Sequence, residues 1–396
     1  MTDPAHAGRP RWDIAEIVRR HRAKLEAIVR LTLEQRRVLR AIELCRTAAL
    51  GGHLDVCRTC GYEHAAYNSC RNRHCPKCQA LAQERWIGAR AERLLPVRHF
   101  HVVFTLPSEL RGLCQFRPRE MFDALFAAAG ETLLELGQTR LSARLGITMV
   151  LHTWTRDLRL HPHVHAIVTA GGLSIEGNQW KPSSHKYLFP VEVMGVLLRG
   201  KMMAALGRLH ARGAFSGFDD FADPEGYDRL MARLAKTDWV VHAEKPFRDV
   251  RFVLRYLGRY THRVAISNSR LVALTDDAVT FRTKDGKTAT LKPVEFLRRF
   301  IQHVLPDGLH KIRHFGLYAG AHAKGALLAA RTMLATPASP AHKLYDGASS
   351  TVTAGWSELL LLLTGRDADR CPRCGGRLEH VPIVACARAP PQRLVA

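Results

Sequence analysis

A histidine-rich apolar segment at residues 160–168 constrains the fold more than any other part of the chain. It reads Leu-His-Pro-His-Val-His-Ala-Ile-Val, with apolar residues between the histidines. Side chains alternate between the two faces of a β-strand, so His163 and His165 fall on one face. Two neighbouring imidazoles on a buried strand indicate a candidate metal site.

A second apolar strand is expected at residues 146–154, and a short turn can join it to a strand over 163–170 as an antiparallel hairpin. That pairing sets His152 across from His163, with both side chains on the face of His165. The sequence therefore predicts a cluster of three imidazoles that is open on one side to a substrate.

Two other residues are alternatives for the third ligand. His161 and Asp157 both lie nearer the turn than His152 does. Imidazole donors do not select one metal, because Zn²⁺, Mn²⁺ and other ions bind such sites, whereas Mg²⁺ prefers oxygen. We expect Gly171 and Gly172 to end the second strand of the hairpin.

Two tyrosines follow about ninety residues later. A helix that begins near Arg248 carries Tyr256 and Tyr260 one turn apart, so both phenols share a face. A phenol has a pKa near 10 and ionises more easily than an aliphatic hydroxyl, which suits a nucleophile. Packing against the sheet is the alternative role for such a pair. A neighbouring set of arginines favours an anionic substrate: Arg255, Arg259 and Arg263.

The charge of the chain indicates the kind of partner. It holds 59 Lys and Arg against 36 Asp and Glu, a net charge of +23, and the excess is spread along the chain. A distributed basic excess suits a surface that follows a phosphate backbone, although solubility or a biased genome would also produce it. No segment reaches the ~18 apolar residues of a membrane span, and no phosphate-binding loop indicates a nucleotide cofactor.

Cysteine pairs indicate metal binding in a reducing compartment. Cys57 and Cys60 form one C-x-x-C pair, and Cys75 and Cys78 form another. Two such pairs complete a tetrahedral, structural Zn²⁺ site, so we expect these four thiolates to bind one zinc. Cys70 and His74 could replace members of the set, and a redox pair is the alternative reading. The loop between the pairs is basic, and we expect Arg71 and Arg73 to contact phosphates.

The tail repeats the motif more weakly. Cys371 and Cys374 form a third C-x-x-C pair, and His380 and Cys386 are spaced to complete a second zinc set. A lone pair that binds nothing is the alternative.

Periodicity and capping signals place the regular elements. Asp13 and Thr32 begin two N-terminal helices, each with an acidic or amide residue three positions later. Residues 320–336 form either a linker or a loosely packed helix. Further helices are expected over 79–95, 120–136, 191–212, 227–235 and 294–304, further strands over 99–106 and 239–242, and turns at 276–277 and 285–286.

Taken together, these strings resemble the bacterial rolling-circle insertion-sequence transposases of the two-tyrosine His-hydrophobic-His class, known as the insertion sequence 91 family. The resemblance covers most of the chain and rests on residues 69–79, 99–107, 152–154, 161–165 and 255–263. It implies an α+β fold in which helices flank an antiparallel sheet and a zinc-binding module comes first. The implied division is 1–52 helical segment, 53–95 zinc module, 96–270 catalytic domain with the tyrosine helix, and 271–396 strand and helix region.

The resemblance also implies an activity. Tyr256 and Tyr260 would cleave single-stranded, hairpin-bearing transposon ends through 5′-phosphotyrosine intermediates, with His163 and His165 holding Mg²⁺ or Mn²⁺. The implied location is the bacterial cytoplasm, at the nucleoid. A plasmid replication initiator or relaxase uses the same chemistry and is the nearest alternative. A non-catalytic zinc-finger DNA-binding protein and a metal hydrolase with a water nucleophile are the others.

Overall fold

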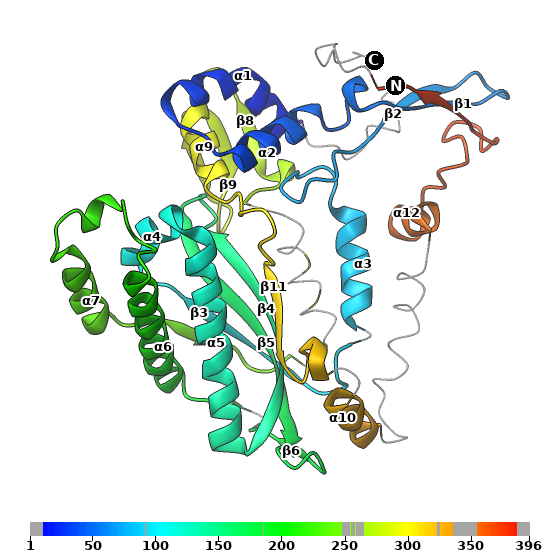
Figure 1. Cartoon of the computed structure of the whole chain (residues 1–396). Helices are drawn as coiled ribbons and strands as arrows, with labels where there is room; N and C mark the ends of the chain where they lie inside the picture. Colours follow the sequence, from blue (N-terminus) through cyan, green and yellow to red (C-terminus); the bar gives the residue numbers. More distant parts are fainter. Residues whose placement is uncertain are drawn as a thin grey trace.

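The computed structural model describes residues 11–91, 93–184, 186–247, 254, 258, 265–322, 325–335 and 355–385. They form a mixed α and β structure with three antiparallel sheets, which confirms the predicted fold class (Figure 1). The helices are α1 (Ile14–Ile28), α2 (Leu33–Leu44), α3 (Ala80–Ala91), α4 (Arg111–Phe116), α5 (Pro118–Leu141), α6 (Val191–Ala211), α7 (Gly226–Lys236), α9 (Pro293–Ile301), α10 (Ala326–Leu334) and α12 (Trp356–Thr364).

The largest sheet has the strand order β11-β4-β5-β3-β7, and β6 pairs with the far end of β5. A second sheet joins β12, β1 and β2, and a third joins β10, β9 and β8. The strands are β1 (Gly52–Val56), β2 (Glu63–Tyr67), β3 (His99–Thr105), β4 (Ala143–Trp154), β5 (Leu160–Ser174), β6 (Trp180–Pro182), β7 (Val241–Ala243), β8 (Leu271–Leu274), β9 (Val279–Arg282), β10 (Thr288–Leu291), β11 (Ile312–Gly316) and β12 (Glu379–Ile383).

The two faces of the large sheet differ in composition because side chains alternate along each strand. On β3, Phe100, Val102 and Phe104 belong to the main hydrophobic core, whereas His99 and His101 take the intervening positions. Helices α5 and α6 supply the other side of that core and cover this face of the sheet (Figure 1). The opposite face is the one that carries histidines.

Helix α3 packs on the histidine face. Trp86 of α3 contacts Val150 of β4 and Ile167 of β5, together with Phe247 and Ile312. A second small core joins the end of α3 to the start of α10. Helices α3 and α10 therefore lie on the face of the sheet whose strands carry the histidines.

A second lobe lies above the large sheet in Figure 1 and contains α1, α2, α9 and the β8–β10 sheet. Its core joins Ile17 and Leu39 of the N-terminal helices to Phe281, Phe296 and Phe300. Segments about 250 residues apart in the chain thus share one core. The four-part division of the chain remains a prediction, and this core draws residues from its first and last parts.

Most predicted helices correspond to the structure. Both predicted N-caps are present, and the reciprocal capping box is confirmed at Thr32. The Asp13 side chain accepts from the Ala15 N–H, and Thr32 and Gln35 cap each other reciprocally. The predicted linker or helix over 320–336 contains α10. In the third sheet, Asp285 and Gly286 both have positive φ, as a tight hairpin turn requires.

One prediction about the hairpin is wrong. Gly171 and Gly172 do not end the second strand but lie within β5, where they pair with Pro182 and Lys181 of β6. A Cβ on Gly171 would lie 2.5 Å from the Lys181 carbonyl oxygen, and its φ is +127°. The two glycines therefore serve a close strand approach rather than a chain reversal.

Candidate metal and DNA site

The predicted hairpin register is confirmed. Strands β4 and β5 pair antiparallel with His152 opposite His163, and the next register positions set Val150 opposite His165. His152, His163 and His165 each offer a ring nitrogen within 4.8 Å of the others. Their ring centroids are 5.3 Å apart for His152 and His163, 4.1 Å for His152 and His165, and 4.9 Å for His163 and His165. We call these three residues the histidine cluster.

The two alternative third ligands lie elsewhere. His161 is outside the group, and its carbonyl oxygen accepts a hydrogen bond from His163 Nδ1 at 2.7 Å. Asp157 is paired with Arg159 at 2.6 Å, in the turn between the two strands. The geometry therefore supports His152, and His161 orients the ring of His163 through its backbone.

A chain of hydrogen bonds fixes the ring of His165. His101 of β3 lies on the same face, and its Nε2 is 2.7 Å from His165 Nδ1. On its other side, His101 Nδ1 is 3.3 Å from a carboxylate oxygen of Glu244. A carboxylate only accepts, so a neutral His101 donates from Nδ1 and accepts at Nε2 from His165 Nδ1–H. The lone pair of His165 is then on Nε2, as it is for His163.

Burial keeps the histidine cluster neutral. It lowers the pKa of His163 to about 4 and that of His165 to about 2. Burial also lowers the pKa of His152 well below its usual value, and the neighbouring His165 adds to the effect. A neutral imidazole carries one unprotonated ring nitrogen, the form that binds metal ions, so this donor set fits a divalent cation.

The predicted nucleophiles Tyr256 and Tyr260 lie outside the described residues, as do Arg255, Arg259 and Arg263. Two helical residues of the same segment are described. Leu254 packs with Leu95, Leu317 and Tyr318, and a Cβ on Gly258 would lie 2.7 Å from Ile87 Cδ1 of α3. These two positions thus contact the elements that bound the histidine face.

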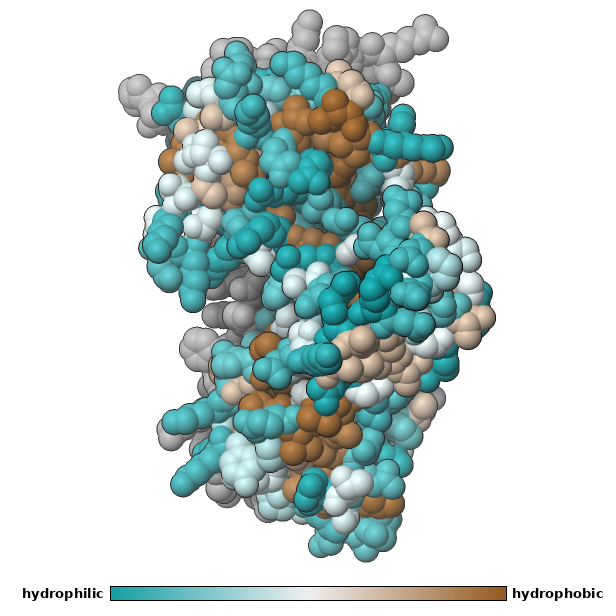
Figure 2. Space-filling model, turned by 90° about the vertical axis from the view of Figure 1, so that its left-hand side faces the viewer, coloured by the Kyte–Doolittle hydropathy of each residue, from teal (hydrophilic) through white to brown (hydrophobic). Residues whose placement is uncertain are grey.

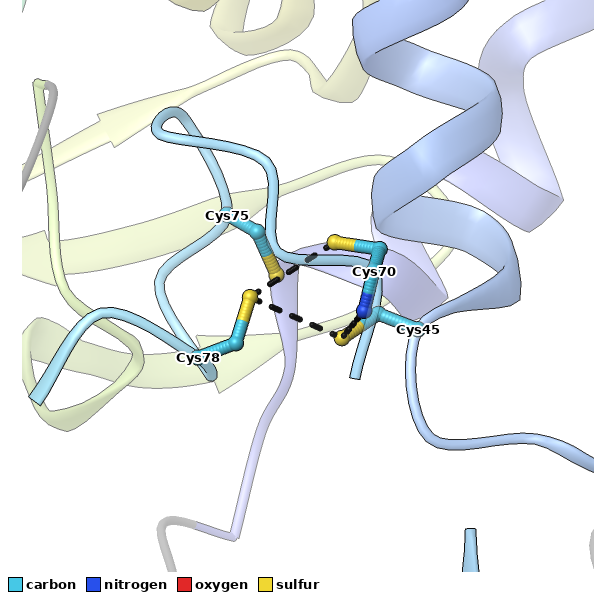
Figure 3. A group of neighbouring side chains, drawn as sticks. All are labelled: Cys45, Cys70, Cys75 and Cys78. Atoms are coloured by element: carbon cyan, nitrogen blue, oxygen red, sulfur yellow. Dashed lines mark hydrogen bonds between the residues drawn. The ribbon is translucent and has the colours of Figure 1, made fainter. Parts of the chain in front are cut away.

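The structure does not bring together the four cysteines predicted to bind one zinc. Cys75 and Cys78 instead meet Cys45 and Cys70, while Cys57 and Cys60 lie in a different group. Figure 3 shows the four sulfurs of the first group pointing toward a common centre. The grouping predicted from sequence is therefore wrong, because the β1–β2 hairpin carries Cys57 and Cys60 away from the loop that ends at Cys78.

The first group fits tetrahedral zinc. Cys78 Sγ lies 3.9 Å from Cys45 Sγ and 3.6 Å from Cys70 Sγ. Thiolates 2.3 Å from one Zn²⁺ at tetrahedral angles would be about 3.8 Å apart. Hydrogen bonding to the Cys45 sulfur raises the pKa of the Cys75 thiol. A bound cation would offset the repulsion among four clustered thiolates. The sequence offers Cys70 as an alternative ligand, whereas Cys45, at the C-cap of α2, belongs to no C-x-x-C pair.

The ligand set predicted for the C-terminal zinc site is also wrong. Cys371 and Cys374 lie with Cys57 and Cys60. His380 is not with them: its Nδ1 is 2.7 Å from Asp55 and its Nε2 is 3.1 Å from Asp369. Cys386 lies outside the described residues.

The two loop arginines predicted to contact phosphates differ. Arg73 donates to the carbonyl oxygens of Leu309 at 3.1 Å and Pro306 at 3.3 Å, so its guanidinium holds a loop in place. Arg71 is exposed and has a positive φ of 52°. Arg71 is thus accessible to solvent, whereas the Arg73 guanidinium is bonded within the protein, and the phosphate contact of Arg71 stays a prediction.

A basic cavity that sequence reasoning missed lies where β5 begins, next to Leu160. It has a volume of about 300 Å³ and is bounded by α4, α9 and the start of β5. Burial lowers the pKa of His161, and the charges on Arg111 and Arg159 contribute. Figure 2 shows that hydrophilic residues cover most of this side of the molecule. The lining residues are Arg111, Gln115, Arg159, Leu160, Arg298, Arg299 and Gln302.

Comparison with known proteins gives consistent matches along the chain. Residues 146–325 match the family described as "Putative transposase", and residues 17–106 match "Transposase zinc-binding domain". "Putative transposase y4qJ" of Sinorhizobium fredii is 39% identical over 393 residues, which is 96% of this chain and 97% of that protein. "Transposase for insertion sequence element IS801" of Pseudomonas savastanoi pv. phaseolicola is 31% identical over 353 residues, 86% and 82% of the two chains.

No solved structure matches the chain. Among the described helices, none combines the length and the apolar content that a membrane crossing requires.

Proposed function

This chain belongs to the insertion sequence 91 family of transposases, and we propose that it cleaves and rejoins single-stranded DNA with tyrosine nucleophiles beside a divalent cation. DNA is the substrate of a transposase. The zinc-binding domain and its cysteine groups indicate that zinc has a structural role. The tyrosine chemistry, the single-stranded substrate and the catalytic cation are the parts proposed. In the cell, the reaction would take place in the cytoplasm at the nucleoid.

The observation that carries the proposal is the histidine cluster. Three imidazoles from adjacent strands converge on one face, and burial holds them neutral. Such a set would hold Mn²⁺ or, with phosphate and water oxygens completing the shell, Mg²⁺. The cation would neutralise a non-bridging oxygen of the scissile phosphate and orient the bond for in-line attack.

The protein supplies the nucleophile. In the proposed step, the phenol oxygen of Tyr256 or Tyr260 loses its proton and attacks phosphorus, and the bond from phosphorus to the 3′ oxygen breaks. The 3′ hydroxyl leaves with a proton, and the 5′ phosphate stays on the tyrosine. A second 3′ hydroxyl reverses the step and forms a new junction. The numbers of bonds formed and broken are equal, so no nucleotide cofactor is needed.

Two further observations support this assignment. Leu254 and Gly258 bracket Tyr256 in sequence, and they pack against the elements that bound the histidine face. Arg111 and Arg159 of the basic cavity act through their charges on His161, whose carbonyl oxygen orients His163. A single strand that occupies the cavity would therefore run toward the histidine cluster, with its phosphates paired to arginines.

The test uses the full-length protein, Mn²⁺ or Mg²⁺, and a single-stranded element end labelled at its 3′ terminus. We expect a labelled covalent adduct on a denaturing gel, with the modified residue mapped to Tyr256 or Tyr260 by mass spectrometry. Tyr256→Phe combined with Tyr260→Phe should abolish the adduct while DNA binding is kept. Tyr227→Phe, a described tyrosine stacked on His210, is the matched control and should leave the adduct unchanged.

The alternatives give different products. A metal hydrolase would cleave without forming an adduct, and a zinc-finger DNA-binding protein would bind without cleaving. A replication initiator would form the adduct but would not join one element end to unrelated DNA. Cleavage that persists in the double tyrosine variant would refute the proposed nucleophiles.

A further inference from the structure

The second cysteine group joins two ends of the chain. Cys57 and Cys60 follow β1, whereas Cys371 and Cys374 precede β12, more than 300 residues later. Strand β12 pairs antiparallel with β1, from Gly52 opposite Ile383 to Val56 opposite Glu379. The C-terminal segment is thus the third strand of the sheet that begins with the β1–β2 hairpin (Figure 1).

The four sulfurs have the spacing of a metal site. Cys57 Sγ is 3.5 Å from Cys374 Sγ, Cys60 Sγ is 3.6 Å from Cys371 Sγ, and all four lie within 4.8 Å of one another. These distances are close to the ~3.8 Å between thiolates on tetrahedral zinc and far from the ~2.05 Å of a disulfide. Cys57 and Cys371 are buried.

The two turns that hold the sulfurs have the same backbone structure. The N–H of Gly61 donates to the Cys57 carbonyl at 2.9 Å, and the N–H of Gly375 donates to the Cys371 carbonyl at 2.9 Å. In each turn the first cysteine N–H donates to the carbonyl five residues later, that of Tyr62 or of Gly376. Both glycines have positive φ, 68° and 74°.

Such matched turns leave both sulfurs of each pair aimed at one point. A thiol pair that merely packs has no need for two turns of identical hydrogen bonding, arranged face to face. Tyr62 and Leu378 close the group on its apolar side. These apolar neighbours shield part of the site from water, as in a closed structural zinc site.

We propose that Cys57, Cys60, Cys371 and Cys374 bind a second structural Zn²⁺, distinct from that of the Cys45, Cys70, Cys75 and Cys78 group. The match to the transposase zinc-binding domain ends at residue 106, so it contains only half of this site. The metal would lock residues 371–385 onto the N-terminal module. Helix α12, on the same C-terminal segment, lies against α3, which packs on the histidine face.

The test is the zinc content of the full-length protein, measured by plasma mass spectrometry after purification with zinc and a reductant. We expect two zinc ions per chain in the wild type and one in Cys371→Ser with Cys374→Ser. Cys114→Ser is the matched control, because Cys114 is a buried cysteine of α4 in the main core, and it should keep both ions.

If the double serine variant folds poorly, a second measurement on the wild type tests the same site. Native mass spectrometry of the wild type during stepwise chelation should show a species with one zinc, and limited proteolysis at that stage should cut first within residues 365–385. The proposal would be overturned by one zinc in the wild type or by two in the double serine variant. It would also be overturned if the wild-type mass were lower by the four hydrogens that two disulfides would remove.

Discussion

The imidazole of His165 is hydrogen-bonded to a second histidine, His101, which in turn contacts the carboxylate of Glu244. His101 bridges His165 and Glu244 with contacts of 2.7 and 3.3 Å, and His101 is 2% exposed. Such outer partners fix the tautomer of a ligating histidine and raise its basicity. His101 is therefore a positioning residue for the proposed cation, reached through His165.

We predict that His101→Ala weakens Mn²⁺ binding by about 10- to 100-fold, the usual effect of losing an outer partner. Glu244→Gln should weaken binding less, because the amide keeps an acceptor but loses the charge. Binding would be measured by the paramagnetic resonance of free Mn²⁺. His310→Ala, at an exposed histidine, is the control. An unchanged Mn²⁺ affinity in His101→Ala would show that His101 only packs.

At the scale of elements, α3 is the link between the zinc module and the histidine face. It follows the loop of the first cysteine group, and its Trp86 and Ile87 pack toward the sheet and toward Leu254. Gly258 allows the close approach: an added Cβ would meet Ile87 Cδ1 at 2.7 Å and Cγ1 at 2.9 Å. The packing of α3 therefore affects the position of Leu254 and Gly258, which belong to the segment that carries the proposed nucleophiles.

Gly258→Ala should destabilise the protein by about 1–3 kcal/mol, the usual cost of overpacking, and should lower adduct formation. Ile87→Ala in the same chain should recover part of both losses, because it removes the atoms that the new methyl meets. Urea unfolding and the adduct assay give the two readouts of this double-mutant cycle. Additive losses would mean that Gly258 and Ile87 do not contact each other.

Over the whole molecule, charge and buried histidines set the response to solution conditions. Four arginines line the basic cavity at the start of β5, and two of them, Arg298 and Arg299, share Glu295. The arginines are only partly neutralised, and the chain carries a net charge of +23. Affinity for single-stranded DNA should therefore depend strongly on salt.

We predict that Arg111→Ala with Arg159→Ala lowers the slope of log affinity against log salt by about 1.4, since each phosphate contact on a single strand contributes about 0.7. Fluorescence anisotropy with a hairpin-bearing strand at several salt concentrations measures it. Arg229→Ala, in an exposed cluster on α7, is the control and should leave the slope unchanged. Tighter binding to duplex than to single strands would contradict the proposed substrate.

Acid should destabilise the fold through histidines outside the proposed site. Burial lowers the pKa of both His99 and His303 to about 4. Between pH 6.5 and 4 the unfolded chain binds protons that the folded protein does not, so stability falls as pH falls. Each group contributes up to about 1.4 kcal/mol per pH unit. Urea unfolding at pH 7 and 5.5 tests this, and His303→Gln should flatten the dependence. Equal stability at both pH values would contradict it.

The local features of this protein follow from its amino-acid sequence alone. Period-two alternation and turn length set the register that places His152 opposite His163, since a strand has no other way to present its side chains. Helix caps, most helix positions and the C-x-x-C turns followed from the same local chemistry. The loop that ends at Cys78 and the turn at Cys57 can each be identified from the sequence by its C-x-x-C pair.

Which segments meet in space depends on long-range contacts in the folded protein. The choice of partners for each cysteine pair depends on contacts across more than 300 residues, and no local pattern encodes these. The same holds for β11 and β12, whose pairing partners lie far away in sequence. Arg73 illustrates the physical reason. Its basic neighbours in the sequence predicted a phosphate contact, but in the folded protein its guanidinium donates to two carbonyl oxygens of residues 306–309.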